Sequence, residues 1–244
     1  MKNIAIIIPS RLEAKRLPNK PLAEINNTPM IIHVLNRAKE SAVGDVIVAT
    51  PDEKIFQVVK KNGGNAVLTK SNHLSGSDRI YEAYTKLLKK NIDLIINLQG
   101  DMPNIKPESI SKLVRLMEKN NCDMGTLASN IKEEDIDDKN VVKVQLNKEL
   151  SDEKFLDAVD FFRIKKNYNI KTIYHHIGCY VFTKDALTRY VDLPRSKLEI
   201  ERNLEQMRAM ENNMTIKVAF SDSMPLSVDT ENDLKKVKKE MGFA

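Results

Sequence analysis

Ile4-Ala5-Ile6-Ile7-Ile8, an unbroken apolar run rich in β-branched residues, stands near the start of the chain. Such a run is typical of a strand that is buried on both faces, as in a parallel sheet covered by helices. The polar segment Pro9 to Pro21 follows it directly. Ligands of such sheets bind beyond the carboxyl ends of the strands, so this segment is the first place to look for a binding site.

The rest of the first half repeats this alternation of short apolar runs and longer amphipathic stretches, which is typical of βαβ units. We expect further strands over Asp45–Thr50, Ala66–Thr69 and Leu94–Leu98. Four helices are expected between and after these strands. The first starts at Pro29, and the second contains Ile55, Val58 and Val59 and ends at Gly63-Gly64. The third runs from a cap at Ser77 or Asp78 to about Lys89, and the fourth begins at Pro107.

Beyond roughly residue 125 the pattern changes to shorter strands, which indicates an antiparallel or mixed addition. The strands expected there are Gly125–Ser129, Val141–Leu146, Ile177–Phe182 and Thr215–Phe220, with helices near Leu198–Asn212 and Glu231–Met241. No linker rich in Pro, Gly or Ser divides the sequence. The sequence therefore predicts an α/β fold with a mostly parallel, mixed sheet flanked by helices, in a single domain over residues 1–244.

The 244 residues carry 39 Lys and Arg against 34 Asp and Glu, a net charge of +5 that favours an anionic partner. Nucleic acid is disfavoured because the basic residues are spread along the chain, Trp is absent and no glycine-rich RNA motif is present. The N-terminal apolar run is too short for a signal peptide or a membrane span, so we expect a cytoplasmic protein. Cys122 and Cys179 have no metal-ligand spacing and are expected to be reduced thiols.

The segment Pro9 to Pro21 contains four cations, Arg11, Lys15, Arg16 and Lys20, between prolines that would stiffen it. Guanidinium and ammonium groups so placed can hold a triphosphate and stabilise charge on departing pyrophosphate. A solvated basic turn is the alternative. The sequence contains neither a Gly-x-Gly-x-x-Gly fingerprint nor a Walker loop, which argues against ordinary dinucleotide and P-loop binders.

Two carboxylates stand after apolar segments. Asp101 lies in Gln99-Gly100-Asp101-Met102-Pro103, directly after the strand that ends at Leu98, and Asp229 lies in Ser227-Val228-Asp229-Thr230, just before a helix. Magnesium usually takes one or two carboxylates and completes its shell with water and phosphate, so the two acids are candidate ligands. Alternatively, the first segment is an ordinary turn and Asp229 caps the helix.

A third polar segment, His73-Leu74-Ser75-Gly76-Ser77-Asp78-Arg79, has small residues that permit close approach to a flat base. Arg79 could then face an anionic substrate. The alternative is an ordinary Ser or Asp helix cap followed by an exposed arginine.

Together these segments, in this order, resemble the 3-deoxy-manno-octulosonate cytidylyltransferase family. Further matching motifs are Asn140-Val141-Val142-Lys143-Val144, Phe162-Arg163, His176-Ile177-Gly178-Cys179-Tyr180, Leu204-Glu205-Gln206-Met207-Arg208 and Val228-Asp229-Thr230. The resemblance implies a sugar-nucleotidyltransferase (Rossmann-like) fold, magnesium as cofactor and a homodimer. It also implies transfer of CMP from CTP to the anomeric hydroxyl of 3-deoxy-D-manno-octulosonate (Kdo), with release of pyrophosphate, for lipopolysaccharide synthesis.

The resemblance also implies roles for three portions of the chain and for individual residues. Residues 1–125 would bind the nucleotide, 126–214 would bind the sugar and dimerise, and 215–244 would return to the main sheet. The implied catalytic residues are Arg11, Lys20, Asp101 and Asp229, the last two as metal ligands. The implied nucleotide-binding residues are Ser10, Arg11, Arg16, Lys20, Ser75, Gly76, Gln99 and Asp101. The implied sugar-binding residues are Arg79, Gln99, Arg163, His176, Tyr180, Glu205 and Gln206.

Judged alone, His176 and Tyr180 could simply pack in the core, and Glu205 could lie on a helix surface. The sequence also departs from the family at Met102, where a glutamate is usual, at Ala14 for a serine and at Leu12 for a tyrosine. Two alternatives stay open. One is a cytidylyltransferase for a related acidic sugar, such as an 8-amino-octulosonate or a nonulosonate. The other, which the loss of that glutamate makes conceivable, is a catalytically silent nucleotide-binding module.

Overall fold

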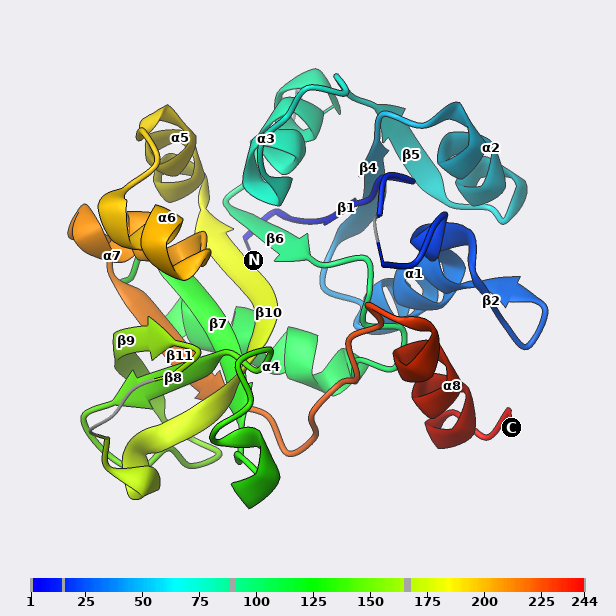
Figure 1. The fold of residues 1–244 in the computed structure, drawn as a ribbon. Helices are drawn as coiled ribbons and strands as arrows, with labels where there is room; N and C mark the ends of the chain where they lie inside the picture. Colours follow the sequence, from blue (N-terminus) through cyan, green and yellow to red (C-terminus); the bar gives the residue numbers. More distant parts are fainter. Residues whose placement is uncertain (1, 15, 88–90, 165–167, 244) are drawn as a thin grey trace. The chain divides into compact units, whose positions relative to one another are not determined.

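The structure is a computed structural model that describes residues 2–14, 16–87, 91–164 and 168–243. Lys15, one of the four cations of the basic segment, and the expected end of a helix near Lys89 lie outside the described residues. The chain forms two compact units (Figure 1). Unit 1 comprises Met1–Ser111 and Pro225–Ala244, and unit 2 comprises Lys112–Met224.

Unit 1 is built on parallel strands in the order β5-β4-β1-β6. Their bounds are Ile4–Pro9 for β1, Asp45–Thr50 for β4, Asn65–Leu68 for β5 and Leu94–Leu98 for β6. Ile6 pairs with Val46 on one side and with Ile96 on the other, and it is fully buried. The expected parallel arrangement of these runs is confirmed.

The helices of unit 1 are α1 (Met30–Glu40), α2 (Glu53–Lys61), α3 (Gly76–Leu87) and α8 (Glu231–Glu240). Helix α4 (Pro107–Lys119) crosses the boundary between the units. The chain leaves α2 through Gly63, whose φ of 68° is in the left-handed region that glycine adopts most easily. Helix α3 begins earlier than expected, because Ser75 and Asp78 exchange hydrogen bonds of 3.1 Å between side chain and backbone in a capping box.

The basic segment after β1 leads through the 3-10 turn η1 (Lys20–Leu22) into the short strands β2 (Glu24–Ile25) and β3 (Thr28–Pro29). This region packs on the C-terminal helix. Leu17, Met30, Val228, Leu234 and Val237 form one buried cluster. Burial of these apolar side chains holds the two ends of the chain together.

Unit 2 contains strands in the order β10-β7-β11-β9-β8, with an additional pairing of β10 with β8. Their bounds are Met124–Ser129 for β7, Lys143–Leu146 for β8, Phe155–Phe162 for β9, Ile173–Thr183 for β10 and Ile216–Phe220 for β11. Strands β11 and β7 are parallel, whereas β10 with β7, β11 with β9 and β8 with β9 are antiparallel. The expected mixed character of this half is confirmed.

The helical elements of unit 2 are α5 (Lys184–Asp192), α6 (Lys197–Arg202), α7 (Gln206–Glu211) and the 3-10 turns η2 (Glu133–Asp135) and η3 (Ile170–Thr172). The single helix expected over Leu198–Asn212 is wrong. Asn203, with φ of 52°, ends α6 in a left-handed turn and separates it from α7. The sequence pattern also missed β9, which is only partly buried along most of its length.

The compact units divide the chain at other positions than the expected portions 1–125, 126–214 and 215–244. Strand β11 lies in unit 2 between β7 and β9, and the return to unit 1 begins at Pro225. In the described part of the chain, no helix is both long enough and apolar enough to cross a membrane.

Candidate active site

The carboxyl ends of β1 and β6 and the start of α3 meet in unit 1, as the parallel sheet predicts. A Cβ placed on Gly76 would lie 3.5 Å from Cγ of Pro9 and 3.7 Å from Nε2 of Gln99. A Cβ on Gly100 would lie only 3.3 Å from the carbonyl oxygen of Pro9. The segments around Ser10, Gly76 and Gln99 are therefore close neighbours.

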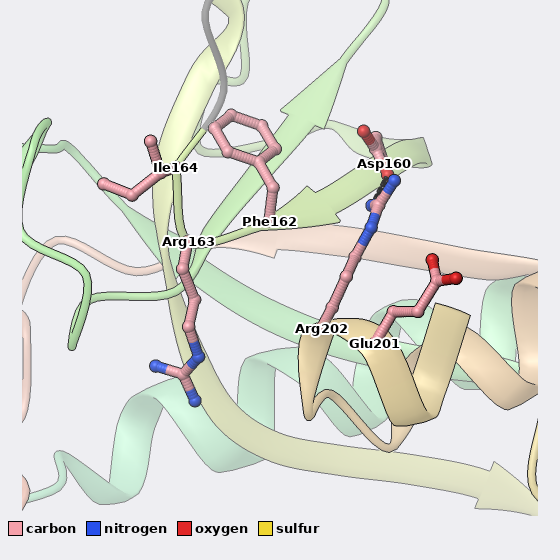
Figure 2. A pocket seen from close by; sticks show the side chains of 6 residues that line it. All are labelled: Asp160, Phe162, Arg163, Ile164, Glu201 and Arg202. Atoms are coloured by element: carbon pink, nitrogen blue, oxygen red, sulfur yellow. Dashed lines mark hydrogen bonds and ion pairs between the residues drawn. The ribbon is translucent and has the colours of Figure 1, made fainter. Parts of the chain in front are cut away.

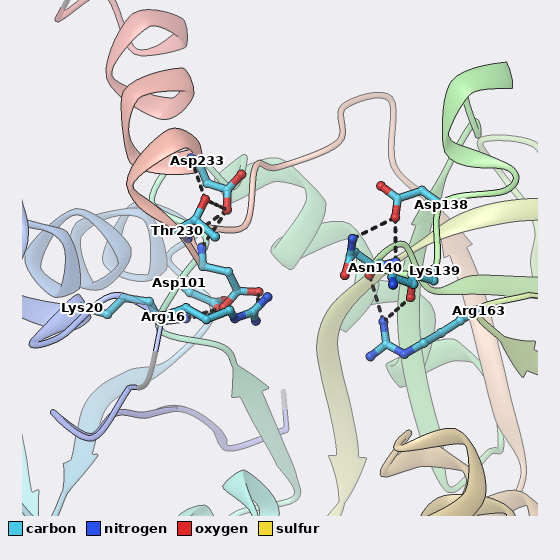
Figure 3. A network of polar contacts seen from close by, with 10 residues as sticks. Arg16, Lys20, Asp101, Asp138, Lys139, Asn140, Arg163, Thr230 and Asp233 are labelled. Carbon is cyan, nitrogen blue, oxygen red and sulfur yellow. Dashed lines mark hydrogen bonds and ion pairs between the residues drawn. The ribbon is translucent and has the colours of Figure 1, made fainter.

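Lys20 contacts both carboxylates that the sequence singles out. Figure 3 labels it with Asp101 and Arg16. The Nζ of Lys20 is 3.0 Å from Oδ2 of Asp101 and 3.0 Å from Oδ1 of Asp229. The other oxygen of Asp229, Oδ2, is 3.0 Å from Nη2 of Arg16. Four residues predicted from three distant parts of the sequence thus form one charged cluster.

Backbone and core contacts hold this cluster in place. The amide of Val228 donates a 3.0 Å hydrogen bond to the carbonyl of Asp101, which ties the two acidic segments together. Leu17 and Val228 belong to the buried apolar cluster that joins the basic segment to α8. Thr230, not Asp229, caps α8 in a capping box with Asp233.

Lys20 and Asp101 are mostly buried, with 18% and 24% of their side chains exposed. Burial by itself would lower the pKa of Lys20, but the charges of Asp101 and Asp229 outweigh it and raise that pKa. The ammonium group therefore stays charged at neutral pH.

Asp101 and Asp229 fit a divalent cation of the magnesium type. Both present an oxygen to the same point, occupied by a lysine cation, and carboxylates are hard ligands that magnesium accepts. Among the described residues, no group of three or more His, Cys, Asp or Glu side chains could hold a metal ion. A metal at this pair would take its other ligands from water and phosphate.

The remaining residues of the basic segment differ in exposure. Arg11 is exposed and lies 3.8 Å from Glu13. Ser10 is buried, its amide donates to Ala49, and its hydroxyl has no hydrogen-bond partner among the described residues. A buried hydroxyl without a partner is costly unless a ligand completes it.

Ser75, Gly76 and Gln99 line the same edge, although two of them already have partners. The hydroxyl of Ser75 accepts from the amide of Asp78 in the α3 cap, and Nε2 of Gln99 donates 2.9 Å to Oδ1 of Asn97. Gly76 brings the first turn of α3 against Pro9 and Gln99. The arrangement offers backbone and amide groups beside the basic segment.

Arg79 is buried, not exposed as in the simple helix-cap alternative. Its Nη1 donates to Oγ1 of Thr69 at 2.6 Å and to the carbonyl of Lys70 at 2.9 Å. Burial first, and then the charge of Arg11, lower its pKa. Arg79 thus holds the segment after β5, and its contact with a substrate stays a prediction.

The other predicted sugar-binding residues belong to unit 2, and two of them lie on β10. His176 is buried, with Nε2 3.0 Å from Oγ1 of Thr126 and its ring 5.4 Å from that of Tyr180. Burial, and then the charge of His175, lower the pKa of His176 to about 3. Burial, with smaller effects from Tyr190 and Glu205, raises the pKa of Tyr180. Both side chains are therefore neutral near pH 7.

Glu205 and Gln206 stand at the start of α7. Glu205 is exposed, its carbonyl accepts a 2.7 Å hydrogen bond from the hydroxyl of Tyr190, and Gln206 is buried. The guanidinium of Arg208, one turn later, lies 4.7 Å from the centre of the Tyr190 ring. These contacts fix the start of α7.

Arg163 follows the last residue of β9 and lines a cavity of about 310 Å³ with Asp160, Phe162, Ile164, Glu201 and Arg202 (Figure 2). Arg202 reaches from α6 to Asp160 and to the carbonyl of Phe161, whereas Arg163 points away from that pair. Nη1 of Arg163 donates to the carbonyls of Asn140 at 2.9 Å and Lys139 at 3.3 Å. Sequence reasoning missed Asp160, since β9 itself was not recognised, and it also missed Arg202 of α6.

With this geometry described, comparison with known proteins identifies the relatives of the chain. Residues 5–216 match the family described as "Cytidylyltransferase". The "3-deoxy-manno-octulosonate cytidylyltransferase" of Bartonella tribocorum (strain CIP 105476 / IBS 506) is 43% identical over 236 residues, covering 96% of each chain. The protein of that name from Rhodopseudomonas palustris (strain BisB5) is 43% identical over 240 residues, covering 98% of this chain and 97% of the relative.

A solved structure of "CMP:2-keto-3-deoxy-manno-octonic acid synthetase complexed with CTP" superimposes with a TM-score of 0.89 and 35% identity, covering 98% of both chains. This similarity confirms the predicted sugar-nucleotidyltransferase type of fold. The matches extend over almost the whole sequence and include both units. The chain therefore belongs to the cytidylyltransferase family and, within it, groups with the 3-deoxy-manno-octulosonate cytidylyltransferases.

Proposed function

We propose that this protein transfers CMP from CTP to the anomeric hydroxyl of Kdo, which gives CMP-Kdo and pyrophosphate. The observation that carries the proposal is the meeting of Lys20, Asp101 and Asp229 at the carboxyl edge of a parallel sheet. The names of the full-length relatives and the CTP in the related structure support the choice of substrates.

In this proposal the anomeric oxygen of the sugar attacks the α-phosphorus of CTP in line with the leaving pyrophosphate. A bond forms between that oxygen and phosphorus while the bond to the β-phosphate oxygen breaks, and the hydroxyl proton is lost to solvent. Lys20, Arg11 and Arg16 neutralise charge on the triphosphate and on the departing pyrophosphate. No covalent enzyme intermediate is needed, because positioning of the substrates and neutralisation of their charge accelerate the direct attack.

We propose that Asp101 and Asp229 hold magnesium when CTP is bound. The ion would supply Lewis-acid stabilisation of phosphate oxygens and would lower the pKa of a hydroxyl next to it. The two carboxylates already present oxygens to one cation, the ammonium group of Lys20, which the ion would replace there. The unpartnered hydroxyl of Ser10 and the segment Ser75-Gly76 would bind the nucleotide beside them.

The residues proposed to bind the acidic sugar are Arg79, Gln99, Arg163, His176, Tyr180, Glu205 and Gln206. Arg163 supplies a cation for a carboxylate, and the neutral His176 and Tyr180 supply hydrogen-bonding groups without adding charge.

The test is pyrophosphate release from CTP and magnesium with a panel of acidic sugars. We expect the highest kcat/KM with Kdo. Preference for an 8-amino-octulosonate or a nonulosonate would reassign the sugar while leaving the reaction intact. CTP binding without pyrophosphate release under any combination of metal and sugar would instead indicate the silent module.

The metal assignment has its own variant. Asp101→Asn removes a carboxylate charge, and we expect turnover to fall by about 100-fold or more. Asp192→Asn, at an exposed position in the last turn of α5, is the matched control and should keep the wild-type rate. An undiminished rate in Asp101→Asn would refute the metal assignment.

We also propose that the protein acts in the cytoplasm as a homodimer. Support for the dimer comes from large apolar side chains of unit 2 that are exposed, namely Val159, Ile164, Ile170 and Ile200. Where such side chains form a contiguous patch, they mark a protein–protein interface. Light scattering after size exclusion measures the mass directly, and Ile200→Glu should shift it towards the monomer.

A further inference from the structure

Lys143 is a fully buried lysine, and neither of the predicted ligand sets includes it. It is the first residue of β8, paired with Phe162 of β9 on one side and with His175 of β10 on the other. A buried ammonium group is costly unless all its donors are used. Its contacts therefore show what this position does.

The three hydrogen bonds of Nζ all go to backbone carbonyls. The acceptors are Asp138 at 2.6 Å, Val141 at 3.1 Å and Arg163 at 2.8 Å. Burial lowers the pKa of Lys143, and the negative charge of Asp138 opposes this effect. Hydrogen bonds from a charged donor in such a setting are stronger than those between neutral groups.

The guanidinium of Arg163 binds the two carbonyls that lie between Asp138 and Val141 in the chain. Its Nη1 donates to Lys139 and Asn140, so four consecutive carbonyls, from 138 to 141, face two cations. Oδ1 of Asp138 further accepts from the amide and the side chain of Asn140, which closes the turn (Figure 3). The turn of residues 138–141 is thereby held as one rigid unit.

Both ends of Arg163 depend on Lys143 in this arrangement. The ammonium group binds the carbonyl of Arg163 directly, and it fixes the turn against which the guanidinium of Arg163 rests. The contacts of that guanidinium with the described residues involve only Nη1, so Nη2 and Nε are left to meet a ligand. We propose that Lys143 is the positioning residue that aims Arg163 at the carboxylate of the acidic sugar.

This inference rests on the proposed function, because it assumes that Arg163 binds the sugar. It predicts that Lys143→Met raises the KM for Kdo about tenfold and leaves kcat and the KM for CTP within about twofold. A merely structural role would not separate the two substrates. Lys132→Met, which removes an exposed lysine from the same region, is the matched control and should leave both KM values unchanged.

A double-mutant cycle tests whether Lys143 acts through Arg163. Arg163→Met alone should raise the KM for Kdo, and adding Lys143→Met to it should raise that KM no further. Multiplying effects, an equal rise in the KM for CTP, or an unchanged KM for Kdo in Lys143→Met would each overturn the inference.

Circular dichroism checks whether Lys143→Met folds. If it does not, Lys143→Arg tests the inference in its place. It keeps a cation among the carbonyls but displaces its donors, so the KM for Kdo should rise by less than in Lys143→Met, about threefold, again without a change for CTP. No rise in that variant overturns the inference. Wild-type protein that releases no pyrophosphate with any sugar acid would overturn the proposed function and this inference together. Normal wild-type turnover with an unaffected Lys143→Arg would overturn the inference alone.

Discussion

Met102, at a position where the family usually has glutamate, is 4% exposed next to Asp101. A glutamate in that place would have its carboxyl group hydrated in the unfolded chain and buried in the folded protein. We expect Met102→Glu to lower the free energy of unfolding by about 1–3 kcal/mol. Urea denaturation measures it, with Met102→Leu as a control of similar volume that should cost less than about 1.5 kcal/mol. A glutamate variant as stable as the wild type would mean that the side chain reaches a cation or solvent.

His176 makes stability depend on pH. Its pKa is lowered from 6.5 to about 3 in the folded protein, so between these values the unfolded chain binds the additional proton. Stability therefore falls as pH falls through that window, by about 2 kcal/mol between pH 7 and pH 5 from this residue. Urea denaturation at both pH values should show a correspondingly smaller loss for His176→Gln. An equal loss in the variant would assign the pH dependence to other groups.

At the scale of elements, the capping box of α8 connects helix stability to the proposed metal site. Oγ1 of Thr230 accepts from the amide of Asp233, and Oδ2 of Asp233 accepts from the amides of Thr230 and Asp229. We expect Thr230→Ala to cost about 1 kcal/mol of stability. Because the backbone of Asp229 is loosened, the magnesium concentration for half-maximal pyrophosphate release should rise about tenfold.

Thr183, which caps α5 through the amide of Ala186, provides the matched control for this effect. Thr183→Ala should lose a similar amount of stability in thermal denaturation and keep the wild-type magnesium dependence. A shift of that dependence in both variants would mean that global loosening, and not the α8 cap, sets metal binding.

At the scale of the whole molecule, both thiols are inside. Cys122 and Cys179 are buried, and burial raises the pKa of Cys179 to about 12. A thiol-reactive reagent should therefore label almost no cysteine in the native protein and both cysteines in denaturant. Rapid labelling of the native protein would show that one of these regions opens readily. The expected reduced state of both cysteines would be tested in the same measurement.

Much of unit 1 followed from sequence because its elements are local. The run Ile4 to Ile8 is apolar on both faces, which predicts a strand of a parallel sheet. Glycine and proline mark the ends of the helices that follow in the sequence, so these helices could be predicted as well. Asp101 and Lys20 follow strands β6 and β1, and the carboxyl ends of adjacent parallel strands meet at one edge. The composition of these segments therefore already indicated a phosphate site.

Tertiary structure alone decided the remaining features, because they arise between residues far apart in the chain. Asp229 reaches Lys20 only through the packing of Leu17 and Val228 and the backbone bond to Asp101. The apolar and polar residues of β9 do not alternate regularly, so its sequence did not identify it as a strand, and its pairing with β8 and β11 defines it. The role of Lys143 was equally hidden, since a lysine in a sequence shows its charge but not the carbonyls that surround it.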